Sequence, residues 1–279
     1  MPLSILLPLM LQIGPGGSLP QAPLQIPQKE IEAVATAPSP QTAENGILQE
    51  CLQLARANPI DAIEVAEDWL PRAQTAQGRA DAKQCHALAL TQIENWSEAA
   101  ALFLSARGDT PMSQREERAR LAALAGNASL AEPNPQAALD ALDLARTDLA
   151  NGSNKKLLSA IEVDRAKALV ALKRPADAAA ALNAARAANP ENAEAWLLSA
   201  TLSRRQGNLA AAQAQIEKAA ELMPIDPEIG LEAGVIAMLL GREDAARKSW
   251  QSVITAGPGS EAAKTAQGYI TQLGARPTP

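Results

Sequence analysis

Aromatic side chains are scarce in this sequence of 279 residues, in which Phe, Tyr and Trp together make up only 2%. Strict alternation of apolar and polar residues, the pattern of a half-buried strand, is also missing. A β-sandwich or an α/β sheet would use runs of Val, Ile and aromatic residues. Much of the apolar content is instead alanine, the strongest helix former. The composition therefore predicts an all-α protein built from many short, closely packed helices.

Reactive groups are equally scarce. The single histidine, His86, excludes the usual zinc and non-haem iron sites, which need several His or Cys ligands. It adjoins Cys85, but neighbouring residues on a helix point about 100° apart, so the imidazole cannot easily take the thiol proton. No phosphate-binding glycine loop or G-x-S-x-G motif occurs. We therefore expect no catalytic residue, no metal and no cofactor, and predict that the chain is not an enzyme.

Clustered positive charge is missing too. The net charge is −6, and Lys and Arg are interspersed with acidic residues. Nucleic-acid binding needs cations gathered against phosphates, so it is not expected.

No apolar run reaches the ~20 residues of a membrane-spanning helix. Leu3–Ile13 has the length of a signal-peptide core and is followed by small residues, although no Lys or Arg precedes it. We expect a signal peptide or apolar tail at 1–18, a Pro/Gln/Ala-rich linker at 19–45, a repeat domain at 46–275 and a disordered tail at 276–279. Export to the periplasm or beyond is one interpretation, with membrane contact only through this segment. A cytoplasmic protein with an apolar tail is the other.

A fixed period organises the rest of the chain. Pro190, Pro224 and Pro258 are each 34 residues apart. A repeat of this length indicates stacked helix pairs. Other columns share the spacing: Ala178, Ala212 and Ala246; Leu182, Ile216 and Trp250; Ala166, Ala200 and Gly234.

The clearest copy predicts a helix over Trp196–Gln206, a turn at Gly207 and Asn208, and a second helix over Leu209–Leu222. Asp226 followed by Pro227 is a good start for the next helix.

Looser copies extend in both directions. The first pair is expected at Ile47–Ala57 and Ile60–Leu70, and a degraded copy begins with Arg115–Ala125 and an insertion over Gly126–Asn134. Glu261–Leu273 has the one-sided apolar pattern of a capping helix. In all, we expect about six helix pairs plus the cap.

The unit from Ala193 to Asp226 resembles the tetratricopeptide repeat, of the kind found in bacterial proteins. It departs from the usual pattern at Ser199 and Ser203. The residues that carry the resemblance are Trp196, Ala200, Gly207, Ala212, Ala219 and Pro224. The resemblance implies a right-handed α-solenoid whose first helices line a concave groove for a peptide or a partner helix.

Mapping the groove of that family onto this chain gives a largely apolar lining, with Arg204 and Arg205 placed to meet an acidic residue of the partner. The mapped positions are Val163, Lys167, Val170, Leu197, Thr201, Arg204, Arg205, Leu231, Val235, Met238 and Leu239. The alternative is that these residues belong to the core, or lie under second helices or the chain's own N-terminal tail.

The resemblance predicts a non-catalytic scaffold that binds another protein or peptide, placed in a bacterial-type envelope if the chain is exported. An accessory or regulatory subunit of an enzyme complex and a cytoplasmic adaptor remain alternatives.

The two cysteines, Cys51 and Cys85, are also 34 residues apart and fall in the first helices of consecutive pairs. Such helices pack side by side, so the sulfurs can form a disulfide if the Cα atoms come within ~7 Å. A disulfide would agree with export. Two buried free thiols are the alternative.

Overall fold

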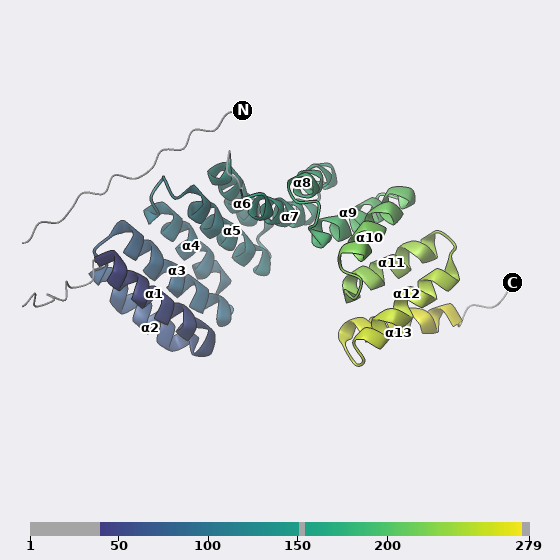
Figure 1. Cartoon of the computed structure of the whole chain (residues 1–279), viewed down its shortest axis with the longest axis horizontal. Helices are drawn as coiled ribbons and strands as arrows, with labels where there is room; N and C mark the ends of the chain where they lie inside the picture. The colour runs from purple at the N-terminus through teal and green to yellow at the C-terminus, as the bar shows by residue number, and fades with distance from the viewer. Residues whose placement is uncertain (1–39, 151–153, 275–279) are drawn as a thin grey trace, which may run out of the picture. The chain divides into compact units, whose positions relative to one another are not determined.

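A computed structural model describes residues 40–150 and 154–274. These residues form thirteen α-helices and one short 3₁₀ turn, Leu70–Arg72, and no strand (Figure 1). The helices are α1 Pro40–Ala57, α2 Pro59–Trp69, α3 Ala76–Gln92, α4 Trp96–Asp109, α5 Arg115–Ala131, α6 Pro135–Leu149, α7 Lys155–Ala171, α8 Pro175–Ala188, α9 Ala193–Arg205, α10 Leu209–Leu222, α11 Pro227–Leu239, α12 Glu243–Ala256 and α13 Glu261–Gly274.

Consecutive helices pair, and each pair packs on the next. The first helices of most pairs (α1, α5, α7, α9 and α11) also touch the first helix that follows. The last helix, α13, contacts both α12 and α11. The predicted all-α class and α-solenoid of six helix pairs closed by a capping helix are confirmed.

The turn inside a pair has a recurring geometry. Lys173, Gly207 and Gly241 have φ angles of 59°, 79° and 72°. After each of them, the next backbone N–H donates to a carbonyl five residues earlier, as Asn208 does to Ser203 at 2.9 Å. This is a Schellman motif, whose left-handed position favours glycine. The glycine column in the sequence therefore marks the hairpin turn.

The small residues of the repeat allow the helices to approach closely. Ala200, Ala212 and Ala219 have no exposed surface and share one cluster with Ile216. Gly234 lies against α12, and a Cβ there would overlap the indole of Trp250. Alanine and glycine at these positions leave room for the larger neighbours, as in any close-packed core.

The expected insertion over Gly126–Asn134 is wrong, because α5 continues as a helix to Ala131. Gly126 faces α6, where a Cβ would come within 2.5 Å of Leu142 Cγ. This glycine is thus a close-packing position inside a helix and not a break.

The start of the helical region also differs from expectation. Helix α1 begins at Pro40, before the expected boundary at residue 46. The expected signal segment at 1–18 and the tail at 276–279 lie outside the described residues.

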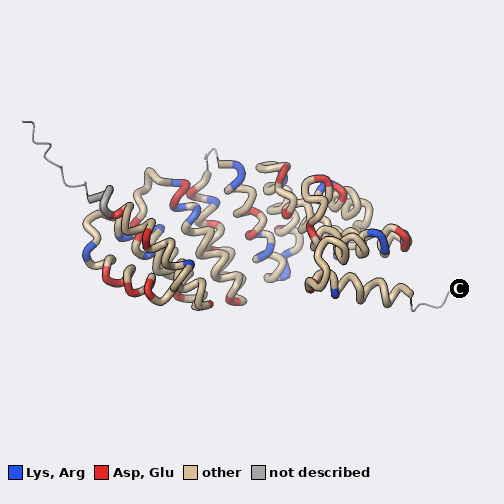
Figure 2. The backbone as a smooth tube through the Cα atoms, turned by 60° about the horizontal axis from the view of Figure 1, so that its bottom comes forward, with Lys and Arg blue, Asp and Glu red and all other residues tan. Residues whose placement is uncertain are grey.

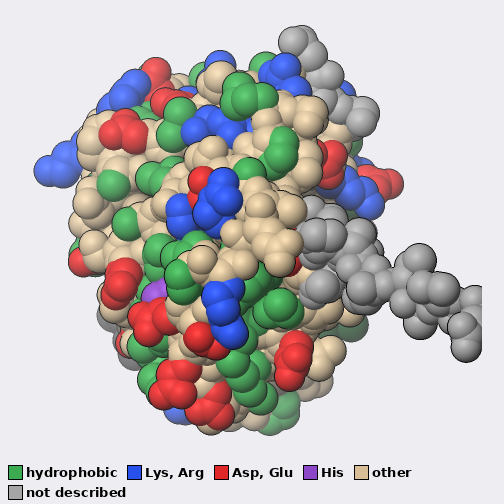
Figure 3. Space-filling view, turned by 90° about the vertical axis from the view of Figure 1, so that its left-hand side faces the viewer, with side chains coloured by type: hydrophobic (Ala, Val, Ile, Leu, Met, Phe, Trp, Pro, Cys, Tyr) green, Lys and Arg blue, Asp and Glu red, His purple; other side chains and the backbone are tan. Residues whose placement is uncertain are grey.

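Both signs of charge are spread along the described helices (Figure 2). At the α1–α2 end, acidic side chains gather near the histidine (Figure 3). His86 Nε2 lies 4.0 Å from Glu67 Oε1 of α2. None of the described helices combines the length and the apolar composition of a membrane span.

Candidate functional site

Helices α7 and α9 bring part of the predicted groove together. A pocket of about 230 Å³ lies between them, with one wall from α8. Four of the predicted residues line it: Lys167, Val170, Thr201 and Arg205. Its other lining residues are Ala166, Leu182, Leu198 and Leu202. We refer to it as the α7–α9 pocket.

The pocket is apolar inside and charged at its rim. Val170 is 37% exposed, so its side chain is available to a partner. Leu182, Leu198 and Thr201 also line the pocket, although Leu182 is only 2% exposed. A pocket of this kind suits one apolar side chain of a bound segment.

The two rim cations differ in their partners. Lys167 Nζ lies 2.9 Å from Asp164 Oδ1 and 2.8 Å from Glu194 Oε1. Burial opposes the charge on Lys167, but its two acidic partners outweigh that effect and raise its pKa. Arg205 is exposed and makes no ion pair with any residue in the described ranges. Arg205 is therefore the cation of this pocket that remains available to a ligand carboxylate.

Arg204 has a different role from the one expected. Its Nε and Nη2 atoms donate to the two carboxylate oxygens of Glu232 on α11, at 2.6 and 3.2 Å. Arginine–carboxylate pairs of this bidentate kind fix geometry. Arg204 therefore joins α9 to α11. Of the two arginines expected to meet an acidic residue of the partner, only Arg205 remains available.

Two other predicted residues are buried. Val163 is 2% exposed and packs with Ala185 and Ala195. Leu197 is 9% exposed and belongs to the cluster around Ala200. The first helix of a pair must cover both its own second helix and the preceding pair, so these two side chains face the core.

The part of the predicted groove on α11 packs partly against α12 and α13. Leu231, Val235 and Met238 are partly buried against the cluster that holds Trp250, together with Tyr269 of α13. The Trp250 and Tyr269 rings lie 5.0 Å apart. Leu239 is 54% exposed. The structure thus separates the α11 residues from the α7–α9 pocket.

The cysteine pair lies at the other end of the described chain. Cys51 of α1 and Cys85 of α3 are both fully buried, with Cα atoms 6.1 Å apart and sulfurs in bonding contact. This separation lies within the range that a disulfide spans.

A family model described as tetratricopeptide repeat matches residues 163–227 and 198–261, which run from α7 to just beyond α12. Residues 163–261 are tetratricopeptide repeats. Both matches include the α9–α10 hairpin, the copy on which the sequence prediction rested. The α7–α9 pocket therefore lies between the first helices of two consecutive tetratricopeptide repeats.

Solved structures share this helical fold. PilF of Pseudomonas aeruginosa is 17% identical, with a TM-score of 0.65, over 83% of this chain and all of that one. PilW, a type IV pilus biogenesis factor, is 19% identical, with a TM-score of 0.65, over 81% of this chain and 98% of that one. A tetratricopeptide repeat protein from Parabacteroides merdae is 14% identical, with a TM-score of 0.61, over 83% and 87%. A comparison with curated proteins finds no sequence match.

Sequence reasoning missed Leu198 and Leu182 in the pocket. Leu182 belongs to a second helix, and the mapping considered only first helices. The period-34 column that contains Leu182 was visible in the sequence, but it marks core positions in every repeat and does not distinguish the one beside a cavity.

Proposed function

We propose that this chain is a non-catalytic scaffold that holds a segment of another protein in the α7–α9 pocket. The observation that carries the proposal is the unpaired Arg205 at the rim of an apolar cavity that contains the exposed Val170. An apolar side chain of the partner would occupy the cavity while an acidic group of the same segment meets Arg205.

An envelope location is part of the proposal. It is supported by the apolar run Leu3–Ile13 and by the close pair of Cys51 and Cys85, which would form a disulfide in an oxidising compartment. PilW, which shares the architecture, is a type IV pilus biogenesis factor. A part in assembling a larger structure is the corresponding proposal for this chain.

The test compares partner recovery by pocket variants and matched controls. We expect Val170→Glu and Arg205→Glu to reduce recovery of crosslinked partner from intact cells by about tenfold, because they place charge in the cavity or reverse the rim charge. Leu104→Glu is the control for Val170, since both side chains are 37% exposed. Arg247→Glu, on an exposed position of α12, is the control for Arg205.

Equal recovery from all four variants, with unchanged helical circular dichroism, would exclude the α7–α9 pocket as the binding site. A fusion of a compartment-sensitive reporter to the carboxyl end of the full chain tests the location. Activity only in the cytoplasm would contradict export and favour the cytoplasmic adaptor.

A further inference from the structure

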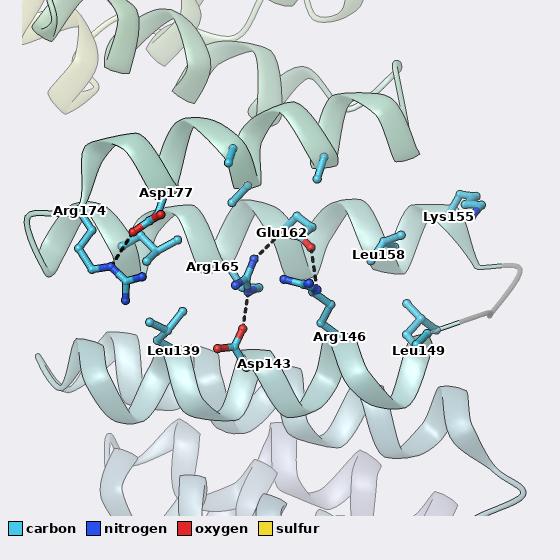
Figure 4. Close-up of a pocket in the computed structure, with 15 residues that line it drawn as sticks. Leu139, Asp143, Arg146, Leu149, Lys155, Leu158, Glu162, Arg165, Arg174 and Asp177 are labelled. Atoms are coloured by element: carbon cyan, nitrogen blue, oxygen red, sulfur yellow. Dashed lines mark hydrogen bonds and ion pairs between the residues drawn. The ribbon is translucent and has the colours of Figure 1, made fainter.

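A larger pocket, of about 630 Å³, lies on another face of α7, between α6 and α8 (Figure 4). Helix α7 lines it with five residues spaced by three, four, three and four positions, which places them on one helical face. These five residues are Lys155, Leu158, Glu162, Arg165 and Leu169. We call this cavity the α6–α8 pocket; it shares no lining residue with the α7–α9 pocket.

The cavity exists because one wall is made of alanine. Helix α8 contributes Ala180, Ala181 and Ala184, whose single-carbon side chains do not fill the space toward α6. Leu139 and Leu149 of α6 complete the apolar part of the lining. The alanine run of α8 in the sequence therefore produces an open groove between two second helices.

Two acidic side chains of the pocket, the buried Glu162 and the exposed Asp143, are paired with one arginine. Arg165 donates from Nε to Asp143 Oδ1 and from Nη1 to Glu162 Oε2, both at 2.7 Å. The Glu162 side chain is only 5% exposed. Burial opposes the charge on Arg165, but the hydrogen bonds and charges of its two acidic partners prevail and raise its pKa. Arg165 therefore holds both acids together at the floor of the pocket.

Arg146 is a cation of the pocket that is not tightly paired with an acidic side chain. It contacts Glu162 only as an ion pair with a 3.6 Å separation, and its side chain is 53% exposed. Lys155 has no ion pair among the residues that the structure describes, and it lines the same pocket. Figure 4 shows Leu149 and Leu158 between these two cations. The arrangement presents two available positive charges with apolar surface between them.

We propose that the α6–α8 pocket is a second binding site, and that it takes an acidic segment of a partner protein. A leucine-sized side chain of the segment lies against the alanine wall of α8, while its carboxylates bind Arg146 and Lys155. The guanidinium of Arg146 has free N–H groups that can form a bidentate pair with a carboxylate. This charge complementarity distinguishes the acidic segment from a basic or neutral one.

The experiment measures the anisotropy of two dye-labelled short peptides mixed with the full chain. One peptide alternates leucine with glutamate, and the other alternates leucine with lysine. We expect only the glutamate peptide to bind, with an affinity that falls as salt rises. Arg146→Glu should weaken that binding by at least about tenfold because it reverses the charge that receives the carboxylate.

A cavity-filling variant tests the location independently of charge. Ala180→Leu should also weaken binding by about tenfold because the added side chain occupies the alanine wall. Ala214→Leu is the matched control. Ala214 is exposed on α10 and occupies the same repeat position as Ala180, 34 residues later. Circular dichroism of each variant verifies that the helices are intact.

The outcomes separate the two sites. Loss of binding in Arg146→Glu and Ala180→Leu, with binding kept in Ala214→Leu and Arg205→Glu, supports the second site. Absence of glutamate-peptide binding, equal binding of the lysine peptide, or insensitivity to Arg146→Glu would overturn it. Loss in Arg205→Glu alone would assign the peptide to the α7–α9 pocket, which leaves the proposed function standing and excludes the second site.

Discussion

At the scale of single residues, Asp81 of α3 is a buried carboxyl group whose surroundings disfavour its charged form. It is 4% exposed and accepts one hydrogen bond from Gln77 Nε2 at 2.7 Å. Burial is the largest effect and raises the pKa of Asp81 above 3.8. The hydrogen bond from Gln77 and the charge of Arg120 lower this pKa, whereas the charges of Glu117 and Glu44 raise it further. The charged form of Asp81 is therefore less stable in the folded chain than in the unfolded one.

We expect Asp81→Asn to raise the melting temperature at neutral pH. Because the folded-state pKa of Asp81 is raised, the folded chain binds more protons than the unfolded chain between pH 3.8 and that pKa. Its stability falls as pH rises through this interval, and the deficit is complete above it. Asparagine keeps the hydrogen bond from Gln77 without the charge, so its advantage should vanish below pH 3.8.

Thermal unfolding of both proteins over a pH series provides the measurement, with Asp61→Asn as a control at an exposed position of α2. An advantage of Asp81→Asn that is the same at pH 3 and pH 7 would contradict the raised pKa.

At the scale of helices, the repeat period correctly predicted the features that depend on local sequence, such as helix bounds and helix caps. Helix α10 has the predicted bounds Leu209–Leu222, and Asp226 caps α11 by accepting from the backbone N–H groups of Glu228 and Ile229. Local sequence is misleading where a residue far along the chain determines the choice of amino acid. Gly126 resembles a helix break in the sequence, but in the structure it is a glycine because Leu142 of α6 occupies the space of a Cβ.

The same distinction applies to the candidate site. Lys167, Val170, Thr201 and Arg205 could be placed on one side of the first helices from repeat position alone, and they line one pocket. The pairing of Arg204 with Glu232 could not be foreseen, since it depends on the distance between two helices. The α6–α8 pocket was missed because an alanine run indicates close packing as readily as an opening.

The Cys51–Cys85 pair joins α1 to α3 and gives a prediction at this scale. We expect reduction to lower the free energy of unfolding by about 2–4 kcal/mol, because the cross-link restricts the unfolded chain. Urea unfolding with and without a reductant measures this. The double variant Cys51→Ala, Cys85→Ala should give one curve under both conditions, which separates the cross-link from the packing of the sulfurs. Wild-type curves that coincide would show that the thiols are free.

At the scale of the whole molecule, the described helices that touch substantially are at most two apart in order along the chain. Stability in such an array is close to a sum over neighbours, so damage at one end should remain local. Helix α13 is the element that closes the carboxyl end, where Ala266 and Leu273 cover the cluster around Trp250.

Deletion of residues 261–279 should therefore destabilise α11 and α12 by roughly 2–4 kcal/mol, because the apolar surface of α13 no longer covers them. Helices α1 to α4 should keep their protection. Hydrogen exchange followed by mass spectrometry resolves the two ends in one experiment. An equal loss of protection along the whole chain would show that the array unfolds as a single unit.

Helix α7 lines both the α7–α9 pocket and the α6–α8 pocket with different residues, and α8 also contributes to both. A helix with its side chains is about 10–12 Å across, so segments bound in the two pockets would lie within about one helix diameter of each other. A displacement of α7 on binding at one pocket would change the shape of the other. The two sites would therefore be coupled through this helix without direct contact between their ligands.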